Sequence, residues 1–182
     1  GIFLSNMGNY EQAEKYYRLA AAQNLSGGQH SLGMMYLNGE GVTKNVEEAL
    51  EWFKLSAEQG EADSQFTIGT IYYLGDGINQ DYEEALNWFK FAALSGHIDA
   101  QFNLGIMYAT GRGTTANAVE AYKWNYLVFI NGGKQVEIEH NIKFLEEYLS
   151  QSSLLSSLKE LRGKFEGFQD GVKSLMTQNA NG

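Results

Sequence analysis

The chain has 182 residues, of which 43% are hydrophobic, and this is enough to build one folded domain of ordinary size. It contains no proline and no cysteine, and its formal net charge is −9. Nucleic acids and anionic membranes attract clusters of lysine and arginine, so this acidic balance disfavours both as partners. No stretch reaches the roughly 18 consecutive apolar residues of a spanning helix, which argues against direct membrane insertion.

A pattern with a period of 36 residues organises the middle of the chain. The recurring residues are Gly33, Gly69 and Gly105; Tyr36, Tyr72 and Tyr108; Ala49, Ala85 and Ala121; and Trp52, Trp88 and Trp124. Self-similarity at such a period indicates a solenoid of stacked repeats. We therefore predict one continuous all-α domain: a partial first repeat at 1–24, repeats at 25–60, 61–96 and 97–132, and a C-terminal helical cap at 133–182.

Residues 1–24 resemble the second half of such a repeat. Asn9 and Ala13 align with Asn45 and Ala49, 36 residues later. The helix that would precede them is missing or reduced, so we expect the chain to be a fragment of a longer array.

Each full repeat is predicted to form two helices. The first has apolar residues at helical spacing and ends at the glycine pair Gly39 and Gly41, because glycine supplies the positive φ that a tight loop needs. The second begins at Asn45, with Glu48 three residues later, which is a capping-box pattern predicted to satisfy two amide groups. Gly60 ends the second helix, and the same signals return in the later copies.

The small residues of the pattern predict close packing between helices. Gly33 lies inside a helix, where glycine costs about 1 kcal/mol relative to alanine. Because glycine recurs at this position in every full repeat, we expect the backbones of two helices to approach closely there. Ala49 and its copies are the natural residues to lie opposite. Trp52 and its copies are predicted to fill the gap between neighbouring hairpins. Since one hairpin cannot bury both of its faces, the hairpins must stack.

This pattern resembles the Sel1-like repeat, a longer relative of the tetratricopeptide repeat. The resemblance rests on Leu-Gly-x-x-Tyr, Gly-x-Gly, an Asp/Asn cap, Ala-x-x-Trp-Phe/Tyr and a closing glycine, over residues 28–132. The runner-up is a tetratricopeptide array, which would run at about 34 residues and lack the Gly-x-Gly loop. The resemblance implies a right-handed α/α superhelix that binds proteins or peptides as an adaptor. Some secreted relatives place a disulfide in each repeat, and a chain without cysteine lies outside that branch.

Beyond Gly132 the period ends. Residues 136–149 are predicted to form another helix, with one apolar face made by Ile138, Ile142, Leu145 and Leu149. Residues 154–175 then repeat leucine, phenylalanine and valine in alternating steps of four and three, which is an a/d heptad seam. We predict a capping helix over the last repeat. The alternative is a homodimer seam or a partner-binding helix within residues 152–176.

The concave surface of stacked two-helix repeats is usually lined by the first helices and binds extended partners. Some inward positions vary between copies, while the framework residues do not. Such positions are free to adapt to a partner. The candidate partner-binding residues are His30, Met34, Leu37, Phe66, Thr70, Tyr73, Phe102, Ile106 and Ala109. For Phe66 and Phe102 a place in the core between repeats is an equally good interpretation, whereas Thr70 and Tyr73 are expected at the surface.

The sequence carries no constellation typical of catalysis, of a cofactor or of a metal site. His30, His97 and His140 are far apart, and none has a second ligand at metal-binding spacing. His97 follows Gly96 at a helix end, where a cation is favourable. The repeated Gly-x-Gly follows a helix rather than a strand, so it is not a dinucleotide loop. We expect no enzyme activity, no cofactor and no metal.

The sequence predicts a scaffold or adaptor that binds a protein or peptide in the concave groove. The alternative is a structural or oligomerisation module acting through the C-terminal heptad helix, and a weaker alternative is a non-catalytic segment of a larger regulatory protein. No signal peptide is visible, which slightly favours the cytoplasm; a periplasmic or secreted protein is the alternative if a signal peptide has been removed.

Overall fold

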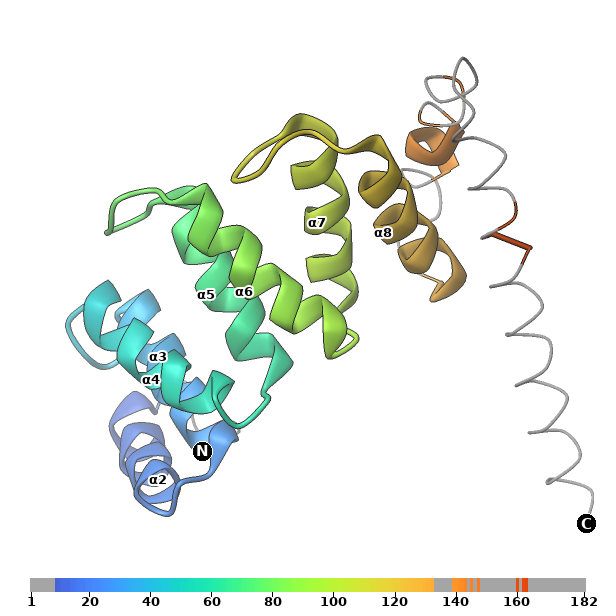
Figure 1. Cartoon of the computed structure of the whole chain (residues 1–182). Helices are drawn as coiled ribbons and strands as arrows, with labels where there is room; N and C mark the ends of the chain where they lie inside the picture. Colours follow the sequence, from blue (N-terminus) through green and yellow to red (C-terminus); the bar gives the residue numbers. More distant parts are fainter. Residues whose placement is uncertain are drawn as a thin grey trace, which may run out of the picture.

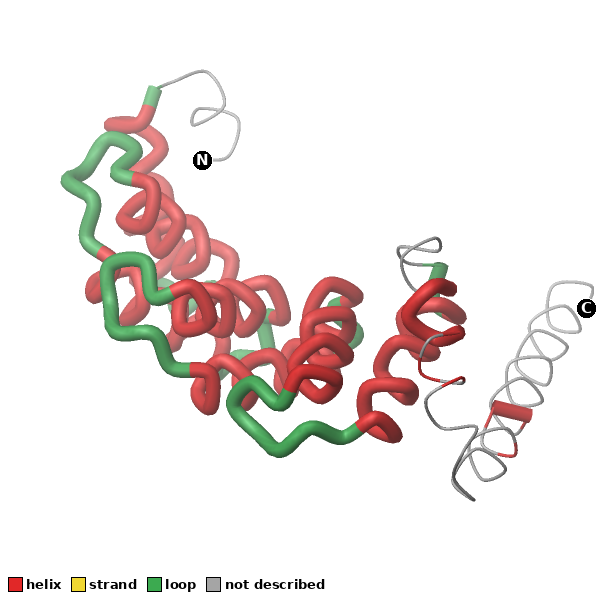
Figure 2. Tube along the Cα trace, turned by 90° about the horizontal axis from the view of Figure 1, so that it is seen from above, coloured by secondary structure: helices red, strands yellow, loops and turns green. Residues whose placement is uncertain are grey.

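The structure, a computed structural model, describes residues 9–132, 139–143, 145, 147, 160 and 162–163, and these form helices and loops without a strand. The helices follow one another in a curved row (Figure 1), which from above bends into an arc (Figure 2). They are α2 (Tyr10–Ala22), α3 (Ser26–Asn38), α4 (Val46–Ala57), α5 (Ala62–Leu74), α6 (Tyr82–Leu94), α7 (Ile98–Thr110) and α8 (Ala118–Ile130). The predicted all-α solenoid is confirmed.

The helices pack as hairpins that stack in sequence. Helices α3 and α4, α5 and α6, and α7 and α8 form the hairpins, and α2 is the second helix of the partial repeat. Each first helix packs both on its own partner and on the preceding second helix. Every hairpin therefore shares its apolar surface with the one before it, as the repeat pattern requires.

Each first helix ends on a glycine in the left-handed region. Gly39, with φ 73°, follows Asn38, and its amide donates to the carbonyl of Met35 at 2.8 Å. Gly75 and Gly111 adopt the same conformation at the ends of α5 and α7. The predicted helix stops are confirmed, because only a residue without Cβ takes this φ at no steric cost.

The second helices begin at the predicted caps, but the predicted second bond of the capping box was wrong. The side chain of Asn45 accepts from the amide of Glu48 at 3.2 Å, as expected. The amide of Asn45 itself donates to the carbonyl of Tyr36 at 2.9 Å, and so does not need the carboxylate of Glu48. Burial, and after it the nearby carboxylate of Glu48, raise the pKa of the Tyr36 hydroxyl. The cap therefore ties the second helix back to the first.

The core of each hairpin is centred on a residue that follows the tryptophan. Phe53 and Phe89 are fully buried, and they, rather than the alanines, face Gly33 and Gly69. Trp52 is half-buried and packs against the apolar cluster of its own hairpin and the cluster between α2 and α3. Trp88 and Trp124 likewise pack against the cluster of the preceding hairpin, so the predicted gap-filling role is confirmed.

A buried glutamine in each first helix is a framework position that the sequence analysis missed. Gln29, Gln65 and Gln101 stand 36 residues apart and are buried. The amide groups of Gln65 and Gln101 donate to the carbonyls of Ala57 and Ala93, each at 3.1 Å. These bonds fix α5 and α7 to the ends of α4 and α6, whereas Gln29 on α3 donates to the side chain of Asn24 at 3.0 Å.

The predicted helix after Gly132 is confirmed as far as the structure describes it. Residues 139–143 are helical, and Ile142 and Leu145 are buried against α8. Ile138, Leu149, residues 1–8 and the heptad seam, apart from Glu160, Arg162 and Gly163, lie outside the described residues. Within the described part of the chain, no helix is both long enough and apolar enough to cross a membrane.

Candidate functional site

Two of the candidate partner-binding residues pack between repeats. The ring of Phe66 stacks on His97, with centroids 4.3 Å apart, and tilts against Phe89 at 5.6 Å. Phe102 packs against the next apolar cluster, which contains Tyr126. Both phenylalanines are half-buried, so their main contacts are with the protein itself.

His97 has a different role from the one predicted. It is the N-cap of α7, where its Nδ1 accepts from the amide of Ala100 at 3.2 Å. Its Nε2 lies 3.4 Å from a carboxylate oxygen of Asp63. The side chain of His97 therefore caps the start of α7, whereas the sequence analysis had placed it at the end of the preceding helix.

His30 heads a chain of hydrogen bonds that crosses the boundary between two repeats. The hydroxyl of Ser64 donates to Ser56 at 2.8 Å, and that of Ser56 donates to the carbonyl of Ser26 at 3.0 Å. Because Ser64 has already used its proton, Nδ1 of His30 must donate to it across 2.8 Å. Burial lowers the pKa of His30, although the carboxylates of Asp63 and Glu61 act in the opposite direction.

One repeat further on, the same four places are apolar. The positions of Ser26, Ser56, Ser64 and His30 are taken by Ala62, Ala92, Ala100 and Phe66. Ser56, Ser64, Ala92 and Ala100 are all fully buried. The four places thus change together from a hydrogen-bonded set to an apolar one, which is how a buried polar group avoids being left unpaired.

Tyr73 is held by its neighbours. Its ring meets the ring of Tyr82 edge-on at 5.2 Å, and its hydroxyl accepts a hydrogen bond from Arg112. The guanidinium of Arg112 lies 5.7 Å from the centroids of both rings. Tyr73 is therefore half-buried in a cluster with the following loop.

An open hollow of about 380 Å³ lies between α3 and α5. Its lining is Leu37, Asn38, Lys44, Thr67, Thr70, Ile71, Leu74 and Asp76. Leu74 is 63% exposed, which is unusual for a leucine beside other apolar side chains. At the rim, Lys44 and Asp76 form an ion pair of 3.2 Å that joins two successive loops. We call this hollow, with its rim, the first-helix groove.

A second hollow, of about 220 Å³, occupies a similar place between α7 and the helix at 139–143. It is lined by Gly105, Ile106, Ala109, Thr110, Asn125, Asn141 and Leu145. Ala109 and Thr110 stand at the positions that Leu37 and Asn38 have two repeats earlier. The first-helix face thus has two hollows, which are lined by different side chains.

The structure brings together some of the predicted site residues and separates others. Leu37 and Thr70 share the first-helix groove, while Ile106 lines the second hollow. Met34 packs against the core cluster of its own hairpin. The sequence analysis missed Leu74, although this position also varies between copies. The equivalent residues in the other two repeats are Asn38 and Thr110.

The chemistry of these hollows suits binding. Among the residues that the structure describes, no group of His, Asp or Glu could hold a metal ion. The hydroxyls of Thr67 and Thr70 donate to the carbonyls of Asp63 and Phe66, which leaves their oxygens as acceptors. The groove thus combines an apolar floor with a few polar acceptors, as is typical of binding sites.

A curved row of two-helix hairpins that share their apolar faces defines a helical-repeat solenoid. The chain belongs to the Sel1 repeat family: the family model described as Sel1 repeat matches residues 4–25, 26–61, 62–97 and 98–124, well over half of the chain. Proteins built from Sel1 repeats are generally protein-interaction scaffolds, and their fold is typically non-catalytic.

Solved structures show the same architecture. A Sel1 repeat protein from Oxalobacter formigenes is 33% identical with a TM-score of 0.74, over 80% of this chain and 59% of that one. A protective antigen of uropathogenic Escherichia coli strains, which displays an SLR fold, is 36% identical with a TM-score of 0.63, over 65% of this chain and 26% of that one. This chain therefore spans less than two thirds of either protein.

A third solved structure shares the fold alone. It is the cysteine rich protein B of Helicobacter pylori, 20% identical with a TM-score of 0.55, over 69% of this chain and 90% of that one. Comparison with curated proteins finds no match.

Proposed function

We propose that the chain acts as an adaptor that holds a peptide segment of a partner protein on the first-helix face, with an apolar side chain of the partner in the first-helix groove. The observation that carries this proposal is the exposure of Leu74, at 63%, beside Leu37 and Ile71 in an open hollow. Exposed apolar surface of this kind, rimmed by polar groups, is typical of interaction sites.

The groove suits one medium-sized apolar side chain. Burial of such a side chain contributes about 1.5–3 kcal/mol, and each 1.4 kcal/mol is about a tenfold change in affinity. One such contact gives weak binding, so a specific partner would have to use further places along the arc. The second hollow, beside Ile106, is one such place.

The charge of the protein favours a basic segment next to that apolar side chain. Residues 9–132 contain 7 lysines and arginines against 15 aspartates and glutamates. This excess of negative charge would speed the approach of a positively charged peptide. We therefore expect the partner segment to combine an apolar anchor with lysine or arginine.

The experiment is selection of binders from a random peptide library on the whole chain, followed by affinity measurement with two variants. Leu74→Glu places a charge in the groove. Leu94→Glu is the matched control: Leu94 is 77% exposed, lies on a second helix, and stands where the preceding repeat has Glu58.

Selected peptides should share an apolar residue flanked by basic ones. Their affinity should fall about tenfold or more in Leu74→Glu and stay unchanged in Leu94→Glu, because only the first substitution buries a charge on binding. Peptides that bind both variants equally well, or a selection that enriches none, would contradict the proposal.

A further inference from the structure

A row of exposed and half-buried apolar side chains runs across the second helices, away from the first-helix groove. Leu19, Leu55 and Phe91 stand 36 residues apart and are 58%, 44% and 55% exposed. Leu127 continues the row on α8, and three residues before each member stand Tyr16, Trp52, Trp88 and Trp124. We call these eight residues the second-helix ridge. Residues three apart on a helix are neighbours, so the ridge is two side chains wide.

The two ends of the ridge differ in the described residues that line the hollow beside them. On α2, an open hollow of about 410 Å³ is lined by Gln12, Lys15, Tyr16 and Leu19. The same four positions on α8, which are Glu120, Lys123, Trp124 and Leu127, line a hollow of about 150 Å³. Its other lining residues are Tyr122, Tyr126, Ile130 and Arg162. A residue of the C-terminal segment therefore already lies at this end.

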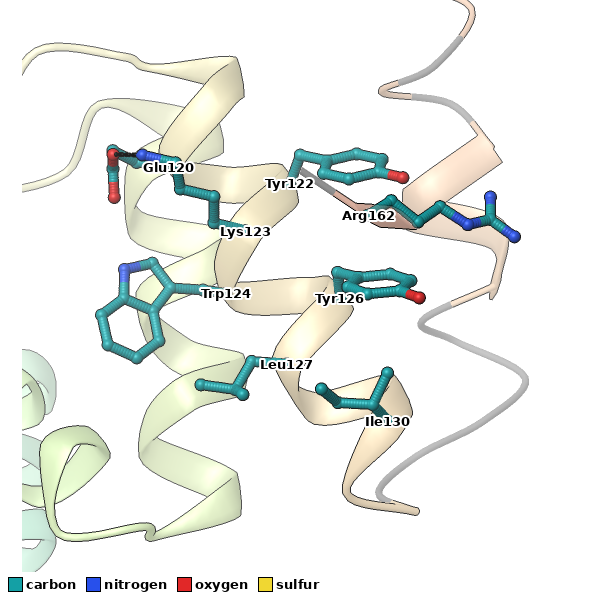
Figure 3. Close-up of a pocket in the computed structure, with 8 residues that line it drawn as sticks. All are labelled: Glu120, Tyr122, Lys123, Trp124, Tyr126, Leu127, Ile130 and Arg162. Atoms are coloured by element: carbon teal, nitrogen blue, oxygen red, sulfur yellow. Dashed lines mark hydrogen bonds and ion pairs between the residues drawn. The ribbon is translucent and has the colours of Figure 1, made fainter. Parts of the chain in front are cut away.

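Arg162 contacts aromatic side chains of α8. Its guanidinium lies 5.7 Å from the ring centroid of Tyr126. The rings of Tyr126 and Tyr122 are nearly parallel, with an interplanar angle of 5° and centroids 6.0 Å apart. In the view of Figure 3 the side chain of Arg162 runs between the two rings, and its guanidinium lies beyond their hydroxyl ends. A guanidinium over an aromatic face is an attractive contact. It places Arg162 next to the end of the ridge.

The sequence on both sides of Arg162 is complementary to the ridge. Residues 154–175 carry an a/d seam of leucine, phenylalanine and valine, which would give a helix one apolar face. Residues 150–182 hold 4 lysines and arginines against 3 acids, in a chain whose net charge is −9. Glu48, Glu84 and Glu120 stand one turn before the ridge tryptophans and so lie beside the ridge.

We propose that residues 154–175 pack as an amphipathic helix onto the second-helix ridge of the same molecule, beginning at α8. The apolar seam covers Leu127 and its neighbours, and the basic residues of the segment lie near the glutamates. This surface lies on the second helices, so the inference does not depend on peptide binding in the first-helix groove.

Cross-linking of the unmodified chain tests this proposal. An amine-reactive cross-linker should join Lys123, which lines the hollow on α8, to Lys159 or Lys164. A mixture of ordinary and ¹⁵N-labelled protein separates links within one molecule from links between two. The expected links join lysines of the same isotopic parent.

Two variants show whether the links depend on the apolar seam. Leu161→Glu places a charge in the seam and should lower the yield of these links about tenfold, because a charge is costly to bury. Ser156→Glu adds the same charge on the opposite side of the heptad and should leave the yield unchanged. Links equally abundant in both variants, absent from the wild type, or joining two isotopic parents would overturn the proposal; the last result would assign the ridge to a second copy.

Discussion

Gly33 lies directly against the ring of Phe53. A Cβ at Gly33 would be 2.6 Å from Cε1 of Phe53, well inside van der Waals contact. Gly69 and Phe89 repeat the relationship at 2.7 Å. Both phenylalanines are fully buried, and protein interiors are too closely packed for such a ring to move aside freely. This pair therefore sets how closely the two helices of a hairpin approach.

Replacing Gly33 by alanine should destabilise the protein. Alanine favours the helix by about 1 kcal/mol, but overpacking a core typically costs about 1–3 kcal/mol. We expect Gly33→Ala to lower the free energy of unfolding, measured by urea denaturation.

The control for this substitution lies in the same helix. A Cβ at Gly27 would have no neighbour within 4 Å. Gly27→Ala should therefore raise stability by about 0.5–1 kcal/mol. If both alanines stabilised the protein alike, the close approach at Gly33 would not be limiting.

Local chemistry made the helix ends predictable, whereas the partner of Gly33 was not. Gly39 and Asn45 act through their own backbone and the next few residues, so the sequence reveals them directly. Ala49 and Phe53 are four residues apart and lie on the same face of α4. Periodicity alone cannot tell which of the two side chains reaches the glycine.

The third hairpin departs from this relationship. Gly105 faces Asn125, which takes the place of Phe53 and Phe89. Asn125 is buried; its amide donates to the carbonyl of Ala121 at 2.7 Å, and its oxygen accepts from Asn141 at 3.4 Å. The smaller side chain leaves part of the second hollow open.

Asn125→Phe should stabilise the third hairpin. The ring would occupy the hollow of about 220 Å³ and replace a buried amide by apolar surface, a gain of about 1–2 kcal/mol. The melting temperature should rise. The reverse exchange, Phe89→Asn, should cost about 3–5 kcal/mol, the usual cost of truncating a buried phenylalanine. A loss of stability in Asn125→Phe would mean that the hairpin is built around the amide.

Variation between copies was an incomplete guide to the site. It marked Leu37 and Thr70, which line the groove. It equally marked His30, which bonds Ser64 and through it belongs to a buried hydrogen-bonded chain with Ser56. In the next repeat both serines are replaced by alanine and His30 is replaced by phenylalanine. The serines lie 26 and 34 residues from His30 in the sequence, so the link is visible only once the repeats are stacked.

The cap of α6 offers a local test of how much each helix start contributes. Asp81 accepts from the amides of Glu83 and Glu84, both at 3.0 Å. Asp81→Ala should lower the free energy of unfolding by about 1 kcal/mol, as loss of an N-cap usually does. Asp76→Ala, which removes only an exposed ion pair with Lys44, should change it by about 0.5 kcal/mol or less. An equal effect of both substitutions would show that the cap bonds contribute little.

Stability should fall at acid pH because of His30. Burial lowers the pKa of His30 from its usual 6.5, so the folded protein binds this proton less tightly than the unfolded chain does. The stability that the neutral ring provides is complete above pH 6.5 and is lost as the pH falls below 6.5 through the folded pKa. Unfolding free energies at about pH 7.5 and about pH 5 measure this loss.

His30→Phe isolates the contribution of that one ring. Phenylalanine occupies the equivalent position in both later copies, as Phe66 and Phe102, so the variant should fold. It should lose less stability than the wild type between the two pH values, because it has no proton to bind there. His140→Gln, at an exposed position, should keep the wild-type dependence. If His30→Phe kept it too, the pH response would have to come from carboxylates elsewhere in the array and not from the hydrogen-bonded boundary between the first two full repeats.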